Sequence, residues 1–212
     1  MTDHPPTPPT VGAILAGGLA RRLGGGDKGL RMVGGRSVLA RLVDRLTPQV
    51  TRLILNANDD PQRFGAFGLP VVADSLPDHP GPLAGVLAAL EWVAETDRAI
   101  EWVVTVAGDA PFVPRDLVEQ LHAGRQDSAA VFACAASHER THPVIALWPV
   151  SLRHDLRNAV AEQGIRKVDR FTQRYSCATV DWPVAHVDPF FNVNTPEDLA
   201  EADRLIAIHP DL

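Results

Sequence analysis

The residues best suited to chemistry form a glycine-rich run near the start of the chain. Residues 15 to 28 read Leu-Ala-Gly-Gly-Leu-Ala-Arg-Arg-Leu-Gly-Gly-Gly-Asp-Lys and follow a short apolar segment. Glycines let the backbone approach phosphate oxygens closely and aim N–H groups at them. Arg21, Arg22 and Lys28 bring the positive charge that a phosphate chain needs. The run therefore favours a cradle for a nucleoside triphosphate over a glycine-rich surface loop without a ligand.

Two better-known phosphate motifs do not describe this run. No Gly-Lys-Ser/Thr sequence closes it, so it is not a Walker A loop. Gly24-x-Gly26-x-x-Gly29 matches the dinucleotide-binding string. That string neither follows the apolar segment directly nor opens a clear helix, so the match is weak.

A second candidate is Asp109, which ends the apolar run Val103-Val104-Thr105-Val106-Ala107-Gly108. Magnesium prefers oxygen ligands and is usually held by one or two carboxylates together with substrate phosphates. A lone aspartate after a strand is more often a turn or helix cap. The residues alone therefore favour the cap over a metal ligand.

The elements that must position these residues alternate between strand and helix patterns. Apolar runs predict strands over residues 11–16, 52–56, 70–73, 102–107, 129–135 and 144–148. Helical periodicity predicts helices after Ser37 to residue 46, from Pro82 onward, over 115–121, over 151–161, and from a Thr195 cap to 206. Alternation of this kind predicts a mainly parallel sheet in a three-layer α/β fold. Strand 144–148 follows strand 129–135 through a short loop, which predicts an antiparallel part.

Polar residues cluster where these predicted strands end. The glycine-rich run follows the first strand, Asn56 ends the second, Asp74 follows the third and Asp109 follows the fourth. Ligands of open α/β sheets bind at the carboxyl ends of the strands. The sequence therefore predicts one site at this edge of the sheet.

Composition narrows the class of protein. The chain has 212 residues, 45% of them hydrophobic, with a net charge of -6 and two cysteines. We expect one domain over residues 11–208 after a disordered tail, residues 1–10. No apolar run has membrane-spanning length and no signal peptide is evident, so a cytoplasmic protein without membrane or nucleic-acid partners is expected. Cys134 and Cys177 give no disulfide framework, and both are expected to be buried core residues.

The charge is unevenly placed along the chain. Residues 21–45 contain seven arginines and lysines but only two carboxylates, Asp27 and Asp44. A local basic patch in an acidic chain indicates a small polyanionic ligand.

The glycine-rich run resembles the signature loop of the sugar-nucleotidyltransferase-like superfamily in Leu15-Ala16-Gly17-Gly18, Gly25, Asp27 and Lys28. Over residues 11–206 the chain resembles the molybdenum cofactor guanylyltransferases. The further segments that carry this resemblance are Asn56-Ala57-Asn58, Asp74-Ser75, Gly81-Pro82-Leu83-Ala84-Gly85, Gly108-Asp109-Ala110-Pro111, His142-Pro143 and Asn192-Val193-Asn194-Thr195-Pro196-Glu197-Asp198-Leu199.

The resemblance implies an α/β/α Rossmann-like nucleotidyltransferase fold and a Mg²⁺-dependent transfer of GMP from GTP to molybdopterin, with pyrophosphate leaving. It implies catalytic roles for Arg22, Lys28 and Asp109, with Asp109 as the metal ligand. The GTP-binding residues it implies are Leu15, Ala16, Gly17, Lys28, Asn56, Asp74 and Asp109. The molybdopterin-binding residues it implies are Gly25, Gly85, Lys167, Asn192 and Asn194. Partners would be GTP, molybdopterin and the apo-molybdoenzymes or their chaperones.

Some assignments stay open on the residues. Lys167 stands where the family has arginine, so it keeps the charge but loses the bidentate fork. Asn192 and Asn194 also suit turn chemistry ahead of the Thr195 cap. A cytidylyltransferase acting on the same cofactor, a sugar nucleotidyltransferase, or a non-catalytic nucleotide-binding module of this fold are the neighbouring functions. The joint presence of Lys28 and Asp109 argues against lost catalysis, and the short chain argues against the sugar enzymes.

One motif points elsewhere. His138-Glu139-Arg140-Thr141-His142 spells the H-E-x-x-H string of zinc proteases. That string binds zinc only on a helix, where both histidines share a face. Here it lies between two predicted strands, and Pro143 disfavours helical backbone at His142. A polar loop is therefore expected instead.

Overall fold

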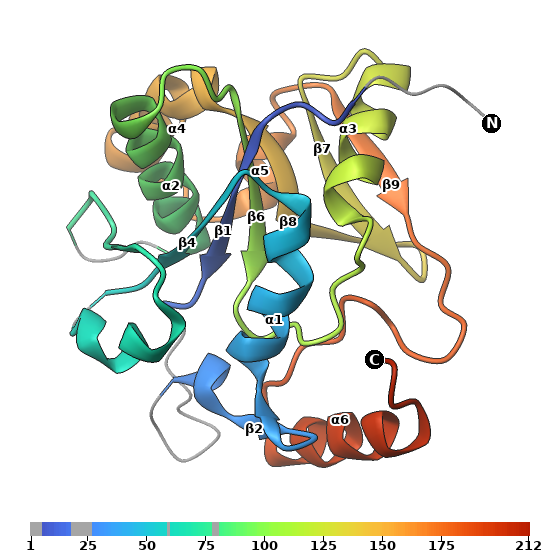
Figure 1. Cartoon of the computed structure of the whole chain (residues 1–212). Helices are drawn as coiled ribbons and strands as arrows, with labels where there is room; N and C mark the ends of the chain where they lie inside the picture. Colours follow the sequence, from blue (N-terminus) through green and yellow to red (C-terminus); the bar gives the residue numbers. More distant parts are fainter. Residues whose placement is uncertain (1–5, 18–26, 59, 78–80) are drawn as a thin grey trace.

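A seven-stranded sheet organises the protein (Figure 1). This computed structural model describes residues 6–17, 27–58, 60–77 and 81–212. The strand order across the sheet is β5-β4-β1-β6-β8-β7-β9. The strands are β1 (Thr10–Leu15), β4 (Arg52–Asn56), β5 (Val71–Val72), β6 (Trp102–Ala107), β7 (Phe132–Ser137), β8 (Arg140–Pro149) and β9 (Cys177–Asp181).

Most strand pairs are parallel, as predicted. β1 lies between β4 and β6, and β4 pairs with β5, all in parallel register. β8 alone reverses direction, because it forms a hairpin with β7 and inserts antiparallel to β6. β7 also pairs with β9 in parallel. The sequence prediction of a mainly parallel sheet with an antiparallel part is confirmed.

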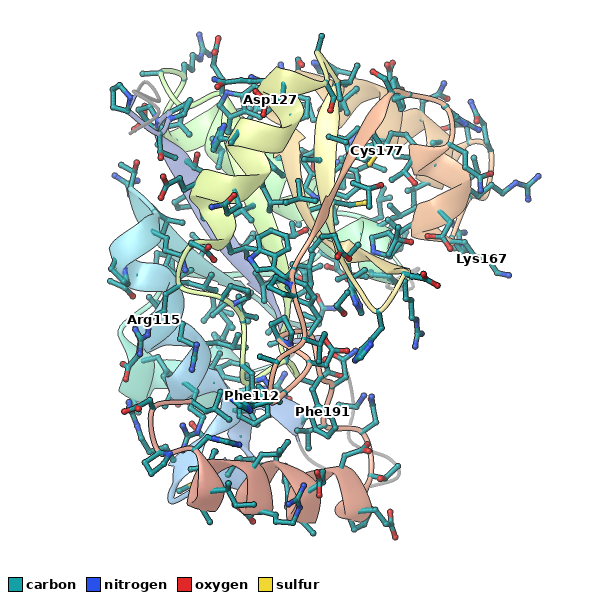
Figure 2. All side chains as sticks on the ribbon, turned by 90° about the vertical axis from the view of Figure 1, so that its right-hand side faces the viewer. Phe112, Arg115, Asp127, Lys167, Cys177 and Phe191 are labelled. Atoms are coloured by element: carbon teal, nitrogen blue, oxygen red, sulfur yellow. The ribbon has the colours of Figure 1, made fainter. Side chains whose placement is uncertain are left out.

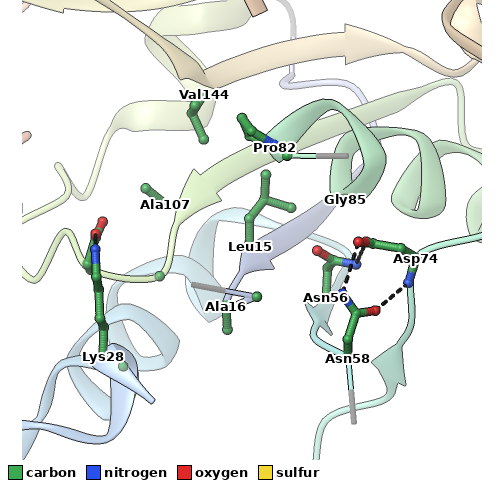
Figure 3. A pocket seen from close by; sticks show the side chains of 15 residues that line it. Leu15, Ala16, Lys28, Asn56, Asn58, Asp74, Pro82, Gly85, Ala107 and Val144 are labelled. Atoms are coloured by element: carbon green, nitrogen blue, oxygen red, sulfur yellow. Dashed lines mark hydrogen bonds and ion pairs between the residues drawn. The ribbon is translucent and has the colours of Figure 1, made fainter. Parts of the chain in front are cut away.

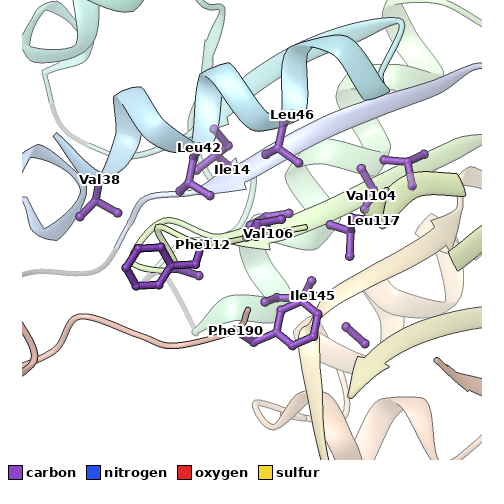
Figure 4. Close-up of a cluster of buried hydrophobic side chains, with 14 of the residues drawn as sticks. Ile14, Val38, Leu42, Leu46, Val104, Val106, Phe112, Leu117, Ile145 and Phe190 are labelled. Carbon is purple, nitrogen blue, oxygen red and sulfur yellow. The ribbon is translucent and has the colours of Figure 1, made fainter. Parts of the chain in front are cut away.

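Helices cover both faces of the sheet. One face packs against α1 (Val38–Leu46), α3 (Leu117–Asp127) and α6 (Pro196–Ile208). The other packs against α2 (Pro82–Thr96), α4 (Arg153–Ala161) and α5 (Val168–Thr172). Successive residues of β1 serve the two faces in turn, with Ala13 on the α2 side and Ile14 on the α1 side. Figure 4 shows Ile14 with Leu42 and Leu46 of α1 in the first of these cores.

Several boundaries differ from the predicted ones. β7 begins at Phe132 instead of residue 129, because Ala129 adopts a left-handed turn with φ +47° after α3. β5 keeps only two residues of the predicted strand 70–73. The β2 (Met32–Val33) and β3 (Arg36–Ser37) hairpin, β9 and α5 were not predicted. All of these elements are short. In β9 only Ala178 is buried, so this edge strand has no alternation of apolar and polar residues that would predict it.

The cysteine prediction is half right. Cys134 of β7 is buried, but Cys177 of β9 is exposed, because β9 is the edge strand of the sheet. The two thiols lie side by side with their sulfur atoms 3.4 Å apart. In the part of the chain that the structure describes, no helix has both the length and the apolarity to cross a membrane.

The basic run is only partly a ligand surface, which corrects the sequence interpretation. Arg41 and Arg45 of α1 are buried. Arg41 Nε donates to the Val33 carbonyl at 2.9 Å and Arg45 Nη1 donates to the Val113 carbonyl at 3.0 Å. Burial lowers the pKa of Arg45 to about 10. Arg36 forms a surface ion pair with Asp44. These cations hold the fold together instead of facing a ligand.

Candidate active site

A pocket opens at the carboxyl ends of β1, β4 and β6, where the sequence predicted a site (Figure 3). Its described part has a volume of about 290 Å³. The residues that line it are Leu15, Ala16, Gly17, Lys28, Gly29, Asn56, Asn58, Asp74, Gly81, Pro82, Gly85, Ala107, Gly108, Asp109 and Val144.

The predicted GTP-binding residues all converge here: Leu15, Ala16, Gly17, Lys28, Asn56, Asp74 and Asp109 line this one pocket. Gly85, predicted for the pterin side, lines it too. Arg22 and Gly25 lie outside the described residues. Lys167 and Asn192 are exposed and do not line the pocket.

One end of the pocket, here called the cationic end, is built around Lys28. Its ammonium Nζ lies 3.2 Å from Asp109 Oδ2 and donates to Asn194 Oδ1 at 2.5 Å. The Lys28 and Asp109 side chains are 23% and 18% exposed, so both remain accessible from the pocket. Three segments far apart in the sequence therefore meet at one ammonium group.

Backbone contacts fix the position of Asp109. The Gly108 amide donates to the Leu15 carbonyl at 2.9 Å, which continues the β1–β6 ladder past the last strand residue. A Cβ atom at Gly108 would lie 2.8 Å from the Leu15 carbonyl oxygen, so only glycine allows this approach. The Val193 amide donates to the Asp109 carbonyl at 2.8 Å.

The other end of the pocket, here called the amide end, consists of Asn56, Asn58 and Asp74. Asn56 Nδ2 donates to Asp74 Oδ1 and Asn58 Nδ2 donates to Asp74 Oδ2, each at 2.9 Å. The Asp74 backbone amide donates to Asn58 Oδ1, also at 2.9 Å. Figure 3 shows this network across the pocket from Lys28. Both carboxylate oxygens of Asp74 thus accept bonds within the protein.

The first turn of α2 forms part of the wall between the two ends. Gly81 precedes the helix with φ +87°, a conformation that favours glycine, and Pro82 occupies the first turn. Gly85 packs directly against the Asn56 amide and Leu15, so any larger side chain there would displace Asn56. A helix N-terminus carries positive potential. This wall therefore attracts anions, as the cationic end does.

The backbone and the side chain of Asn194 make different contacts. The backbone amides of Asn194 and Thr195 donate to Asp198 Oδ2, and the Asp198 amide donates to Thr195 Oγ1. The predicted cap of α6 is confirmed as a capping box. The cap uses only the backbone of Asn194, so its side chain is available to Lys28.

Sequence reasoning did not assign Asn58, Pro82 or Val144 to the site. Asn58 follows Asn56 by two residues, and an extended chain repeats its side-chain direction at that spacing. That signal could have identified Asn58. Pro82 and Val144 enter through the packing of α2 and β8, which no local pattern reveals.

The H-E-x-x-H string is not on a helix. His138 and Glu139 form the β7–β8 turn with φ values of 49° and 59°, and His142 lies in β8. Ser137 donates to Asp188 at 2.8 Å and lies 2.8 Å from His142 Nε2, and burial lowers the pKa of His142. Among the described residues, no group of three or more His, Cys, Asp or Glu side chains could hold a metal ion. The predicted polar loop is therefore only partly right: His138 and Glu139 form the turn, but β8 begins at Arg140 instead of the predicted residue 144 and includes His142.

Comparisons with known proteins agree with this geometry. A family model described as the MobA-like NTP transferase domain matches residues 12–178. A molybdenum cofactor guanylyltransferase of Nitrobacter hamburgensis is 57% identical, covering 95% of this chain and 96% of its own. One from Rhodopseudomonas palustris is 59% identical, covering 97% and 96%.

A solved structure of a related protein has the same fold. Molybdopterin-guanine dinucleotide biosynthesis protein A of Archaeoglobus fulgidus superposes with a TM-score of 0.71 at 26% identity, covering 93% of this chain and 99% of that one. The family model spans β1 to β9, and the relatives extend the match over nearly the whole chain. This chain belongs to the MobA-like NTP transferase family.

Proposed function

We propose that this protein transfers GMP from GTP to molybdopterin, forming the molybdopterin guanine dinucleotide and pyrophosphate. The observation that carries the proposal is the pocket itself, in which an ammonium and a carboxylate face an amide-rich end. Two relatives at 57% and 59% identity carry the name of this activity, which supports guanine over cytosine as the base.

GTP binds with its guanosine at the amide end. Asn56, Asn58 and Asp74 offer carbonyl, amide and carboxylate groups, which match the donors and acceptors of guanine and ribose. Leu15, Ala16 and Gly17 continue β1 beneath the nucleotide and supply backbone groups. Hydrogen bonds among the three side chains restrict their rotamers, so less side-chain entropy is lost when the nucleoside binds.

The phosphates then lie toward Lys28 and Asp109. A terminal phosphate oxygen of molybdopterin attacks the α-phosphorus of GTP, a new P–O bond forms, and the bond to the β-phosphate oxygen breaks as pyrophosphate leaves. A phosphate monoester has a second pKa near ~6, so the nucleophile is already mostly a dianion and needs no general base. Lys28 neutralises charge that builds on the departing pyrophosphate.

Asp109 fits the role of a magnesium ligand. It is a partly exposed carboxylate beside a side-chain amide oxygen, and oxygen ligands are what Mg²⁺ prefers. A site with one carboxylate suits a metal that takes its other ligands from substrate phosphates and water. When bound, the metal would screen the negative charges of the two substrates from each other.

Molybdopterin would enter past α2, beside Gly85. Gly25, Lys167, Asn192 and Asn194 are the further residues expected to contact it, as the family resemblance implies, and Arg22 is expected in a catalytic role beside Lys28. The positive end of α2 favours its phosphate at this wall. The acceptors of the product would be apo-molybdoenzymes or their chaperones, and the reaction is expected in the cytoplasm.

The test supplies molybdopterin, Mg²⁺ and each of GTP, CTP, ATP and UTP in turn, and identifies the pterin dinucleotide by mass. Buried polar groups of the protein that pair with guanine would be left unpaired by a wrong base, at a cost of about 1–3 kcal/mol each. We therefore expect GTP to be preferred by roughly ten-fold or more. Equal or faster formation of the cytosine dinucleotide would move this protein to the cytidylyltransferase activity.

A further inference from the structure

One arginine outside the pocket lining contacts the amide end of the pocket and the residue that precedes Lys28 of the cationic end. Arg63 lies in the 3₁₀ segment η4 (Pro61–Phe67). Its Nε atom lies 3.2 Å from Asp27 Oδ2, and its Nη2 atom donates to the Asn58 carbonyl at 2.6 Å. Asp27 directly precedes Lys28, and Asn58 holds Asp74 through two hydrogen bonds. The guanidinium therefore connects the side chain of Asp27, next to the cationic end, to the backbone carbonyl of Asn58 in the amide end.

The surroundings of this contact make it more than a surface ion pair. The Arg63 and Asp27 side chains are 27% and 10% exposed, so solvent screens the pair only partly. The Arg63 guanidinium also lies 4.9 Å from the ring centroid of the buried Phe64. The contacts with Asp27 and the Asn58 carbonyl use two different nitrogens of the planar guanidinium, Nε and Nη2, and the single nitrogen of a lysine ammonium does not reproduce that fixed spacing.

We propose that Arg63 is a positioning residue that couples the two ends of the pocket, so that occupancy of the amide end by guanosine favours phosphate binding at Lys28. The inference rests on the proposed function, since it takes guanosine and pyrophosphate groups as the occupants. Guanosine at Asp74 and Asn58 fixes the Asn58 backbone. Arg63 then holds Asp27, and with it the start of the Lys28 turn, in the geometry that receives the phosphates. Coupling of this kind is reciprocal, so pyrophosphate strengthens guanosine binding by the same factor.

The experiment measures this coupling directly, without turnover. Calorimetric titrations give the Kd of Mg²⁺-pyrophosphate with and without saturating guanosine, and the Kd of guanosine with and without Mg²⁺-pyrophosphate. In the unaltered protein we expect each ligand to tighten the other by on the order of 10-fold. In Arg63→Ala the factor should fall to nearly one, while each ligand alone binds with a Kd changed much less.

Four further variants test the bridge and its specificity. Asp27→Asn should lose the coupling as Arg63→Ala does, and the double variant should lose no more than either, because one bridge is removed in each case. Arg63→Lys keeps the charge beside Asp27 but not both contacts, so most of the coupling should be lost. Arg36→Ala removes the surface pair with Asp44, away from the pocket lining, and should leave the coupling unchanged.

The outcomes distinguish a failure of the positioning role from a failure of the proposed function. Unaltered coupling in Arg63→Ala, or full coupling in Arg63→Lys, overturns the positioning role while leaving the proposed function intact. A wild-type protein that binds neither GTP nor guanosine overturns the proposed function itself. A thermal unfolding midpoint for Asp27→Asn and Arg63→Ala close to that of the wild type ensures that the measurement reports on folded protein.

Discussion

The two ends of the pocket are built in different ways. At the amide end, Asn56 and Asn58 reach Asp74 across only 18 and 16 residues of chain, and the groups satisfy one another. At the cationic end, Lys28 contacts Asp109 and Asn194 across 81 and 166 residues. The amide end is formed by residues close together in the sequence, whose polar groups pair with one another. The cationic end exists only because distant parts of the fold meet.

This difference predicts how each end meets its ligand. The amide end is expected to keep its internal hydrogen bonds and to bind guanosine through the lone pairs and N–H groups that those bonds leave unused. At the cationic end, Lys28 and Asp109 neutralise each other, although the proposed reaction needs Lys28 on phosphate and Asp109 on a metal. We expect Lys28 to exchange its carboxylate partner for phosphate oxygens as the nucleotide binds. Substitutions at the cationic end should therefore lower mainly kcat, and substitutions at the amide end should raise mainly the KM for GTP.

The largest effect is expected from Asp109→Asn. Loss of the carboxylate removes the proposed anchor for Mg²⁺, and metal charge stabilisation is worth several kcal/mol in such reactions, or about 100-fold or more in kcat/KM. GTP affinity measured with and without Mg²⁺ should become nearly equal in the variant. Asp127→Asn, at the exposed end of α3 (Figure 2), is the matched control. If Mg²⁺ strengthens GTP binding equally in both variants, Asp109 is not the ligand.

Lys28→Ala should come next. It removes the cation that stabilises departing pyrophosphate, so kcat should fall on the order of 100-fold while GTP binding weakens less. The unfolding midpoint should change little, because a partly exposed ion pair contributes only about 0–1 kcal/mol. Single-turnover kinetics separate the two quantities, with Arg98→Ala as a surface control. A variant that unfolds but keeps its activity per folded molecule would assign Lys28 to the fold instead.

Asp74→Asn should have the smallest effect and a different signature. One amide NH₂ would then face a donor of Asn56 or Asn58, which disturbs the network and costs about 1–3 kcal/mol of nucleoside binding. We expect a higher KM for GTP, a kcat changed much less, and an unaltered Kd for Mg²⁺-pyrophosphate. Asp127→Asn again provides the control. A fall in kcat with an unchanged KM would place Asp74 at the reacting phosphates and remove the distinction between the two ends.

Local sequence patterns predicted the amide end better than the cationic end. Asn56 ends β4 and Asp74 follows β5, so the rule for parallel sheets places both at one edge. Asp109 follows β6 and is the part of the cationic end that the same rule predicts. Lys28 was predicted from charge among glycines, but its contact with Asn194 depends on where α6 lies, which no local pattern states. The seven-cation run illustrates the same limit. From the sequence, Arg41 and Arg45 were counted among the cations that face a ligand, but in helix α1 both donate hydrogen bonds to backbone carbonyls.

The distance in sequence between Lys28 and Asn194 has a consequence for the order in which the protein is made. β1 needs β6 as its neighbour, and Lys28 needs a residue 166 positions later. Contacts of long sequence separation form late, because the chain between them must be closed first. During synthesis, the residues of the amide end have all been added once β5 is made. The cationic end needs the segment that opens α6, so the site for phosphoryl transfer can be complete only when almost the whole chain has been made.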